Sequence, residues 1–140
     1  TGGSMLLFPG IQQEADFVTI HGNGRKVDEK AARTRELFEN PKAPGPIYVN
    51  EDDSGRETMP DVLARELASC DAVFQAGGSW GYMPWRQLQM FPFPHVSPGP
   101  SAVVRADMPE SARDAAYFKA VLEHVRELVL RTPPPASSRY

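Results

Sequence analysis

The sequence predicts an α/β fold of parallel strands with outer helices, and three observations support this class. Short β-prone runs alternate along the chain with segments of helical periodicity. The run Ile47-Tyr48-Val49 is apolar throughout, as in a parallel strand that is covered on both faces. Each expected strand ends in polar or aromatic residues, which suits the loops at one edge of a parallel sheet. This order of elements requires right-handed β-α-β crossovers.

The composition is that of one soluble globular domain. The 140 residues are 41% hydrophobic and 24% charged, which suffices for a single core. The formal net charge of -3 gives no basic footprint, so neither nucleic acid nor an anionic membrane surface is an expected partner. The single cysteine, Cys70, excludes an internal disulfide, and no apolar run is long enough to span a membrane. No cofactor is expected, and the sequence leaves the localisation unknown.

The first expected elements are a strand and a helix. Residues 1–14 form a lead-in that fits either a short added tail or a truncated natural N-terminus. A strand over 15–20 ends in the polar, glycine-containing turn 21–24. A helix over 27–38 follows, with two acids in its first turn and apolar residues at helical spacing. The domain is expected to begin with this strand.

The central strand, expected over 46–51, ends in three consecutive acids. Glu51, Asp52 and Asp53 repel one another, and in a partly dry cleft their mutual repulsion would raise some of their pKa values. Such a cluster is typical of a site that uses a cation, a substrate or solvent. The alternative is a solvated acidic turn that precedes the next helix.

The second half of the chain is expected to hold two helices and one strand. A short helix begins at Pro60 and ends near Ser69, and a third strand covers 71–76. A loop over 77–85 and a proline-rich connection lead to a long amphipathic helix over 111–131. The domain therefore spans 15–131, and 132–140 is a flexible tail.

Unusual residues gather at the expected strand ends, where α/β proteins build their active sites. Aromatic rings stack on the faces of sugars, while carboxylates and amides bind hydroxyl groups. The sequence therefore indicates a carbohydrate site. The candidates at these ends are His21, Asn50, Glu51, Asp52, Asp53, Trp80 and Tyr82.

Three motifs resemble the last three strand ends of a TIM-barrel glycoside hydrolase-like protein of the retaining type. They are His21-Gly22-Asn23, the run from Tyr48 to Asp53, and Ser79-Trp80-Gly81-Tyr82. The similarity covers residues 15 to about 130 and implies a partial (β/α)8 barrel, strands six to eight, with carbohydrate as substrate. By this resemblance His21 takes the position of the strand-six residue, Glu51 that of the nucleophile, and Trp80 that of a substrate-stacking ring.

The resemblance also implies a missing partner. In the family the general acid/base lies at the end of strand four, and this chain contains only what resembles strands six to eight. Retaining hydrolysis needs two carboxyl groups about 5 to 5.5 Å apart. Glu51 cannot supply both, so the chain is expected to need the N-terminal barrel half or self-association, since the first strand would otherwise leave an open edge.

Each candidate residue also has a structural interpretation. Glu51 is the predicted catalytic residue, although a binding carboxylate is the alternative. Asp52 and Asp53 could instead order their loop, Trp80 could belong to the core, and the asparagines are common turn residues. His124, on the last helix, is expected to lie at the surface. The predicted substrate-binding residues are His21, Asn23, Asn50, Asp52, Asp53, Trp80, Tyr82 and Trp85.

Two other functions remain open at this point. A non-catalytic carbohydrate-binding module would use the same acids and aromatic rings without turnover. A metal-dependent hydrolase would hold a hard divalent cation between His21 and the cluster of Glu51, Asp52 and Asp53. No HxH or HExxH spacing supports the metal alternative, and no metal is predicted.

Overall fold

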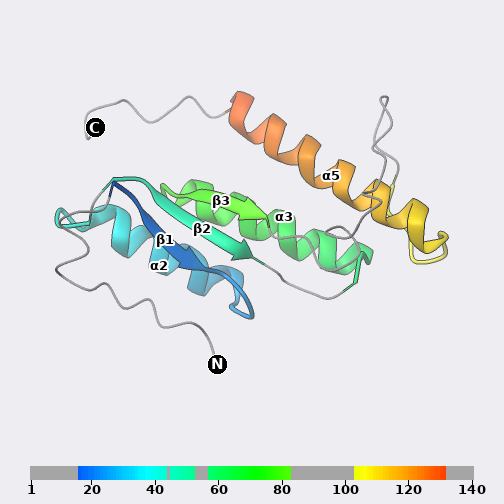
Figure 1. The fold of residues 1–140 in the computed structure, drawn as a ribbon, viewed down its shortest axis with the longest axis horizontal. Coiled ribbons are helices and arrows are strands. Elements are labelled where there is room, and N and C mark those ends of the chain that lie inside the picture. The colour runs from blue at the N-terminus through cyan, green and yellow to red at the C-terminus, as the bar shows by residue number, and fades with distance from the viewer. Residues whose placement is uncertain (1–15, 44, 53–56, 83–102, 132–140) are drawn as a thin grey trace.

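The computed structural model describes residues 16–43, 45–52, 57–82 and 103–131. Within these residues, three strands form one parallel sheet in the order β1-β2-β3, and three helices alternate with or follow them (Figure 1). The predicted α/β class with parallel strands is therefore confirmed. The elements are β1 (Val18–His21), α2 (Val27–Glu39), β2 (Ile47–Asp52), α3 (Pro60–Gln75), β3 (Ser79–Tyr82) and α5 (Glu110–Arg131).

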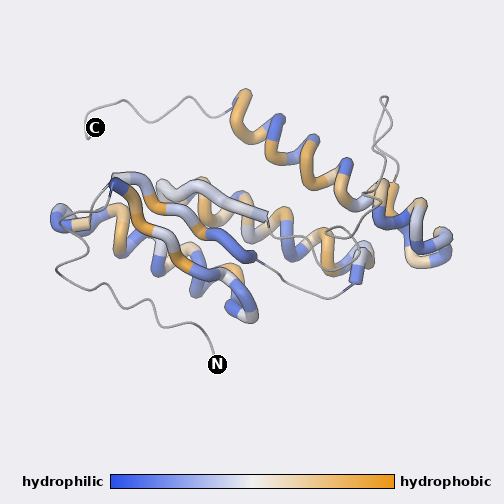
Figure 2. The backbone as a smooth tube through the Cα atoms, viewed as in Figure 1, coloured by the Kyte–Doolittle hydropathy of each residue, from blue (hydrophilic) through white to orange (hydrophobic). Residues whose placement is uncertain are grey.

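The helices α2 and α3 cover one face of the sheet, as right-handed crossovers between sequential parallel strands require (Figure 1). Residues of β1 and β2 alternate between buried and exposed, and Figure 2 shows the matching alternation of hydropathy along β1. Val18 and Val49 point into the core with the helices. On the opposite face Phe17 is 53% and Tyr48 is 42% exposed, so the prediction that the central strand is covered on both faces is wrong for the described residues.

The predicted third strand over 71–76 is wrong, because these residues complete α3. Buried positions in this helix recur at steps of three and four residues, from Val62 through Cys70 to Val73, and one helix face buries them all. Gly77 ends the helix with a φ of 88°. Its N–H donates to the carbonyl oxygen of Phe74, and the N–H of Gly78 donates to that of Val73, which is the Schellman arrangement.

The strand that follows, β3, begins two residues after Gly77 and lies inside the loop predicted over 77–85. Tyr48 pairs with Ser79 and Val49 with Trp80. Beyond these pairs the register shifts, because Asp52 is the partner of Tyr82. The sheet thus contains a β-bulge at the carboxyl end of β2.

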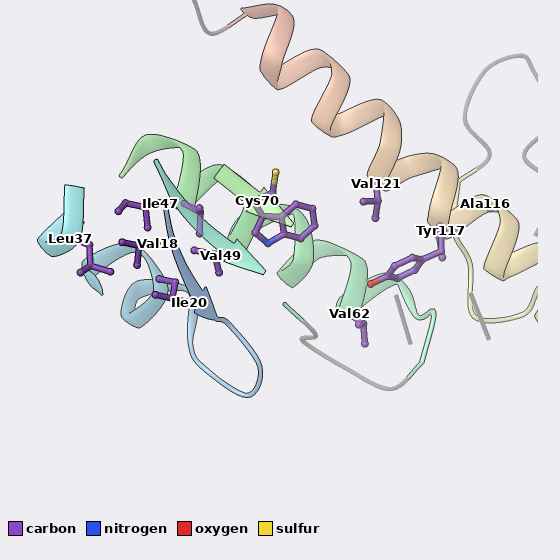
Figure 3. Packing of buried hydrophobic residues seen from close by; sticks show 13 residues of the cluster. Val18, Ile20, Leu37, Ile47, Val49, Val62, Cys70, Ala116, Tyr117 and Val121 are labelled. Atoms are coloured by element: carbon purple, nitrogen blue, oxygen red, sulfur yellow. The ribbon is translucent and has the colours of Figure 1, made fainter. Parts of the chain in front are cut away.

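Helix α5 packs mainly against α3 (Figure 1). Two polar contacts fix it: Thr58 Oγ1 donates to Asp114 Oδ1 at 2.5 Å, and His124 Nε2 lies 2.7 Å from Asp71 Oδ1. His124 is thus a contact between helices and not a free surface residue. Tyr117 is the largest fully buried side chain of the core (Figure 3).

Of the apolar residues that recur at helical spacing in α5, Phe118, Val125 and Leu128 are partly buried against the core. Tyr117 and Val121 are buried, whereas Leu122 and Val129 are exposed. Ala116, Tyr117 and Val121 are the buried residues through which α5 joins the core cluster (Figure 3). None of the described helices is both long enough and apolar enough to cross a membrane.

Candidate functional site

The carboxyl ends of β1 and β2 bring two predicted site residues together. His21 pairs with Asn50 in the sheet, and His21 Nδ1 lies 3.2 Å from Glu51 Oε2. The two side chains are 50% and 42% exposed, respectively, so a ligand in solution can reach both. This contact joins two of the strand-end candidates, His21 and Glu51.

Glu51 lies in the left-handed region of the backbone, with a φ of 49°. A residue with a Cβ atom pays about 1–2 kcal/mol for this conformation. Glu51 belongs to the bulge, because β2 advances three positions from Val49 to Asp52 while β3 advances only two, from Trp80 to Tyr82. Strained residues and bulges concentrate at functional sites, so the conformation of Glu51 favours a role there.

Asp52 points away from this pair and into the core, where it forms a network that we call the Asp52 clamp. Lys30 Nζ, from α2, donates to Asp52 Oδ1 at 2.5 Å. Trp80 Nε1, from β3, donates to Asp52 Oδ2 at 2.8 Å. Lys30 is 1% exposed and Asp52 is 0% exposed, so this ion pair is fully buried. The clamp consists of Lys30, Asp52 and Trp80.

The surroundings of the clamp are built to hold a carboxylate. Lys30 Nζ also donates to Ser69 Oγ at 3.0 Å, which ties α3 to the same point. A Cβ atom at Gly22 would lie 2.8 Å from Cγ of Asp52, so the turn after β1 must be glycine there.

Burial, together with the negative charges of Asp71 and Asp52, raises the pKa of the Cys70 thiol to about 12. Cys70 is therefore a neutral thiol and not a nucleophile.

Asn50 connects the candidate site to the open face of the sheet. Its Oδ1 atom is buried and accepts no hydrogen bond from any described residue. Asn50 also lines a hollow of about 280 Å³ together with Phe17, Thr19 and Tyr48. The rings of Phe17 and Tyr48 meet edge to face, with centroids 5.5 Å apart. The exposed rings of Phe17 and Tyr48 can stack on the apolar face of a sugar.

Trp80 is positioned as a core residue. Its side chain faces the helices, is 9% exposed and stacks on Tyr82 with centroids 5.7 Å apart. Tyr82 in turn lies 6.4 Å from the ring of Tyr117 on α5. The three rings join β3 to α5, so the alternative that placed Trp80 in the core describes this arrangement.

The remaining candidates are spread more widely. Asn23 lies half-buried in the turn after β1. Asp53 and Trp85 lie outside the described residues. Lys30 was not among the candidates, although it is a central member of the clamp. The signal that could have found it is its spacing, because Lys30, Thr34 and Leu37 share the buried face of α2.

The described residues contain no group of three or more His, Cys, Asp or Glu side chains that could hold a metal ion. The direction of Asp52 explains part of this finding. Its two oxygens are engaged by Lys30 and Trp80, so it does not join His21 and Glu51 around a shared point.

The fold and the site together define an α/β protein with a parallel sheet and an exposed glutamate–histidine pair at the carboxyl edge of that sheet. No protein-family model, curated protein or solved structure matches the chain. The likeness to a glycoside hydrolase therefore depends on the residues of this chain alone.

Proposed function

We propose that the chain is the C-terminal part of a glycoside hydrolase-like barrel that acts on carbohydrate, with Glu51 as the nucleophile. The observation that carries the proposal is the position of Glu51. Its carboxylate is exposed at the carboxyl end of a central parallel strand and lies 3.2 Å from His21 Nδ1. Glu51 itself is a bulge residue with a left-handed backbone conformation. Carboxyl ends of parallel strands are where α/β folds bind their ligands.

In this mechanism Glu51 attacks the anomeric carbon of a sugar, and the glycosidic bond to the leaving group breaks as a glycosyl ester forms. His21 Nδ1 lies 3.2 Å from Oε2 of Glu51 and thereby orients the attacking carboxylate. Asn50 lines the adjoining hollow, where its side chain can contact the sugar. The second carboxyl group, which protonates the leaving oxygen and then activates water, comes from another strand of the completed barrel.

The arrangement of elements supports the barrel part of the proposal. Sequential order β1-β2-β3, with α2 and α3 on one face, is that of an arc of barrel wall with outer helices. The opposite face would then line the barrel interior, where Thr19 and Tyr48 point. Among the described residues β1 and β3 each pair with β2 only, so both edges are available for the remaining strands.

A carbohydrate-binding module without turnover is the second candidate. The hollow lined by Phe17, Thr19, Tyr48 and Asn50 favours it, because two exposed rings and an amide can bind a sugar without a second carboxyl group. The metal-dependent alternative is disfavoured, because the clamp holds Asp52 away from Glu51 and His21.

Covalent labelling distinguishes the two candidates. Aryl glycosides with good leaving groups need no general acid, so Glu51 can form the glycosyl ester without the second carboxyl group. The ester should then accumulate, because no base activates water to release it. We expect the intact chain to gain the mass of one glycosyl group, and peptide mapping to place it on Glu51.

The matched control is Glu127→Gln, which removes a carboxylate on the exposed face of α5. Glu51→Gln should abolish the labelling, and Glu127→Gln should leave it intact. Sugar binding without any labelling would favour the binding module. Labelling that survives Glu51→Gln would contradict the assignment of the nucleophile.

A further inference from the structure

The bulge at Glu51 inverts the normal alternation of β2. A regular strand would place Glu51 on the helix side with Val49, and Asp52 on the open face with Asn50. The structure instead buries Asp52 completely, against α2. The extra residue in the bulge produces this inversion, because it turns the next side chain to the other face.

The strain at Glu51 must be balanced by neighbouring contacts. Both oxygens of Asp52 are held, one by Lys30 and the other by Trp80. These two partners come from α2 and β3, which lie on either side of the bulge in the sequence. In regular alternation Asp52 would leave both partners. The buried ammonium of Lys30 would lose the Asp52 carboxylate, and the buried indole N–H of Trp80 would lose its acceptor, at a cost that opposes relief of the strain.

We propose that Lys30 and Trp80 are positioning residues that act through Asp52 to hold Glu51 in its bulge and against His21. This inference takes its functional meaning from the proposed role of Glu51, but its geometry can be measured independently. Gly22 is part of the same arrangement of residues. It follows His21 directly, and it leaves room for the Asp52 carboxylate where a Cβ atom would lie 2.8 Å from Cγ.

The test measures the contact between His21 and Glu51 by NMR, on the chain with isotope-labelled histidine. The chemical shifts of the His21 ring nitrogens depend on the Glu51 carboxylate, which lies 3.2 Å away. The His21→Gln variant identifies which histidine signals belong to His21. Glu51→Gln defines the signals of His21 without this contact. Lys30→Met and Trp80→Phe each remove one partner of Asp52, and we expect both to shift the His21 signals in the same direction as Glu51→Gln.

Ser69→Ala is the matched control, because Ser69 accepts a hydrogen bond from Lys30 and does not contact Asp52 in the clamp. It should lower stability and leave the His21 signals unchanged. Unchanged signals in folded Lys30→Met and Trp80→Phe would overturn the proposal. If Lys30→Met does not fold, Trp80→Phe and Gly22→Ala carry the same test. Failure of all three to fold would also overturn it, because the clamp would then serve the fold and not the position of Glu51.

Glycosyl labelling of the same variants separates this inference from the proposed function. If the His21 signals shift in both clamp variants but Glu51 is not labelled in the parent chain, the positioning role is supported and the hydrolase mechanism is contradicted. Labelling of Glu51 at the parent rate in both clamp variants retains the mechanism and removes the positioning role.

Discussion

At the scale of single residues, the clearest feature is the fully buried ion pair of Lys30 and Asp52. Burying two charges is costly, and their attraction repays the cost only where hydrogen bonds satisfy both groups. Here Trp80 and Ser69 supply such bonds, one to each member of the pair. The pair therefore specifies where α2 meets the end of β2, whatever its net contribution to stability.

Breaking this pair should be more harmful than replacing it. Lys30→Met leaves the Asp52 carboxylate buried without its cation, and we expect a loss of about 3–5 kcal/mol in the free energy of unfolding. The double variant Lys30→Met with Asp52→Leu should be more stable than Lys30→Met alone, because the Asp52 carboxylate is no longer buried without Lys30. Urea unfolding of the parent, both single variants and the double variant measures this. A double variant no more stable than Lys30→Met would contradict the prediction.

Cys70 gives a second prediction at this scale. Because its pKa is raised from an ordinary value of 9.0 to about 12, the folded thiol stays protonated where the unfolded thiol ionises. The unfolded state then binds fewer protons, so this contribution to stability is complete below pH 9 and is lost as the pH rises toward 12. The expected slope is about 1.4 kcal/mol per pH unit within that window.

Unfolding free energies measured across this pH window, with Cys70→Ala as control, test the slope. The control removes the titrating thiol and should flatten the profile. Since Cys70 is the only cysteine, thiol reagents give an independent reading. They should label the native chain slowly and the chain in urea quickly. Rapid labelling of the native chain at pH 8 would contradict the buried, neutral thiol.

At the scale of elements, the end of α3 decides where β3 begins. The apolar run Ala72-Val73-Phe74 satisfies a strand pattern and a helix pattern equally well. The helix prevails because Cys70 and Val73 continue the buried face that starts at Val62. Gly77 then closes the helix and starts the connection to β3.

Gly77→Ala should therefore destabilise the fold. The substitution forces an alanine into a φ of 88° and places a Cβ atom 2.7 Å from the ring of Phe38. Gly24→Ala is the matched control, because Gly24 also has a positive φ but has open space around it. We expect Gly24→Ala to cost about 1–2 kcal/mol, and Gly77→Ala to cost about 1–3 kcal/mol more through overpacking. Equal losses in chemical denaturation would contradict the contact with Phe38.

At the scale of the whole molecule, the sheet has one covered face and one open face. Phe17 and Tyr48 expose large rings on the open face. In the described part of the chain, nothing but β2 pairs with β1 or β3. Open edges and exposed apolar patches favour association with further strands. The chain should therefore associate with itself through this face and these edges.

Sedimentation over a range of concentrations tests this expectation. Thr19→Lys places a charge on the open face of the edge strand and should shift the chain toward monomer. Ser111→Lys is the matched control, because it adds the same charge at an exposed position of α5. A monomer at every concentration, or an equal effect of both variants, would contradict association through this face.

Much of the architecture was predictable from local sequence patterns. Parallel strands at Val18 and Ile47, and helices over 27–39 and 110–131, follow from hydrophobic periods and from glycine and proline positions. The polar ends of the first two strands were also predictable. Because parallel strands share one carboxyl edge, His21 and Glu51 were expected to meet, and they do.

What the sequence alone could not give is the direction of individual side chains. Lys30 reads as a surface residue, and Trp80 reads as a ring in a loop, yet both are buried against Asp52. A lysine is buried only where a carboxylate from a distant segment meets it, and that pairing is a property of the packed fold. The bulge that separates exposed Glu51 from buried Asp52 arises in the same way. The sequence determined the first two strands, α2, α5 and the edge that carries the site, because these depend on local periodicity. The tertiary structure decided that Glu51 is exposed and Asp52 buried, because that depends on partners from α2 and β3.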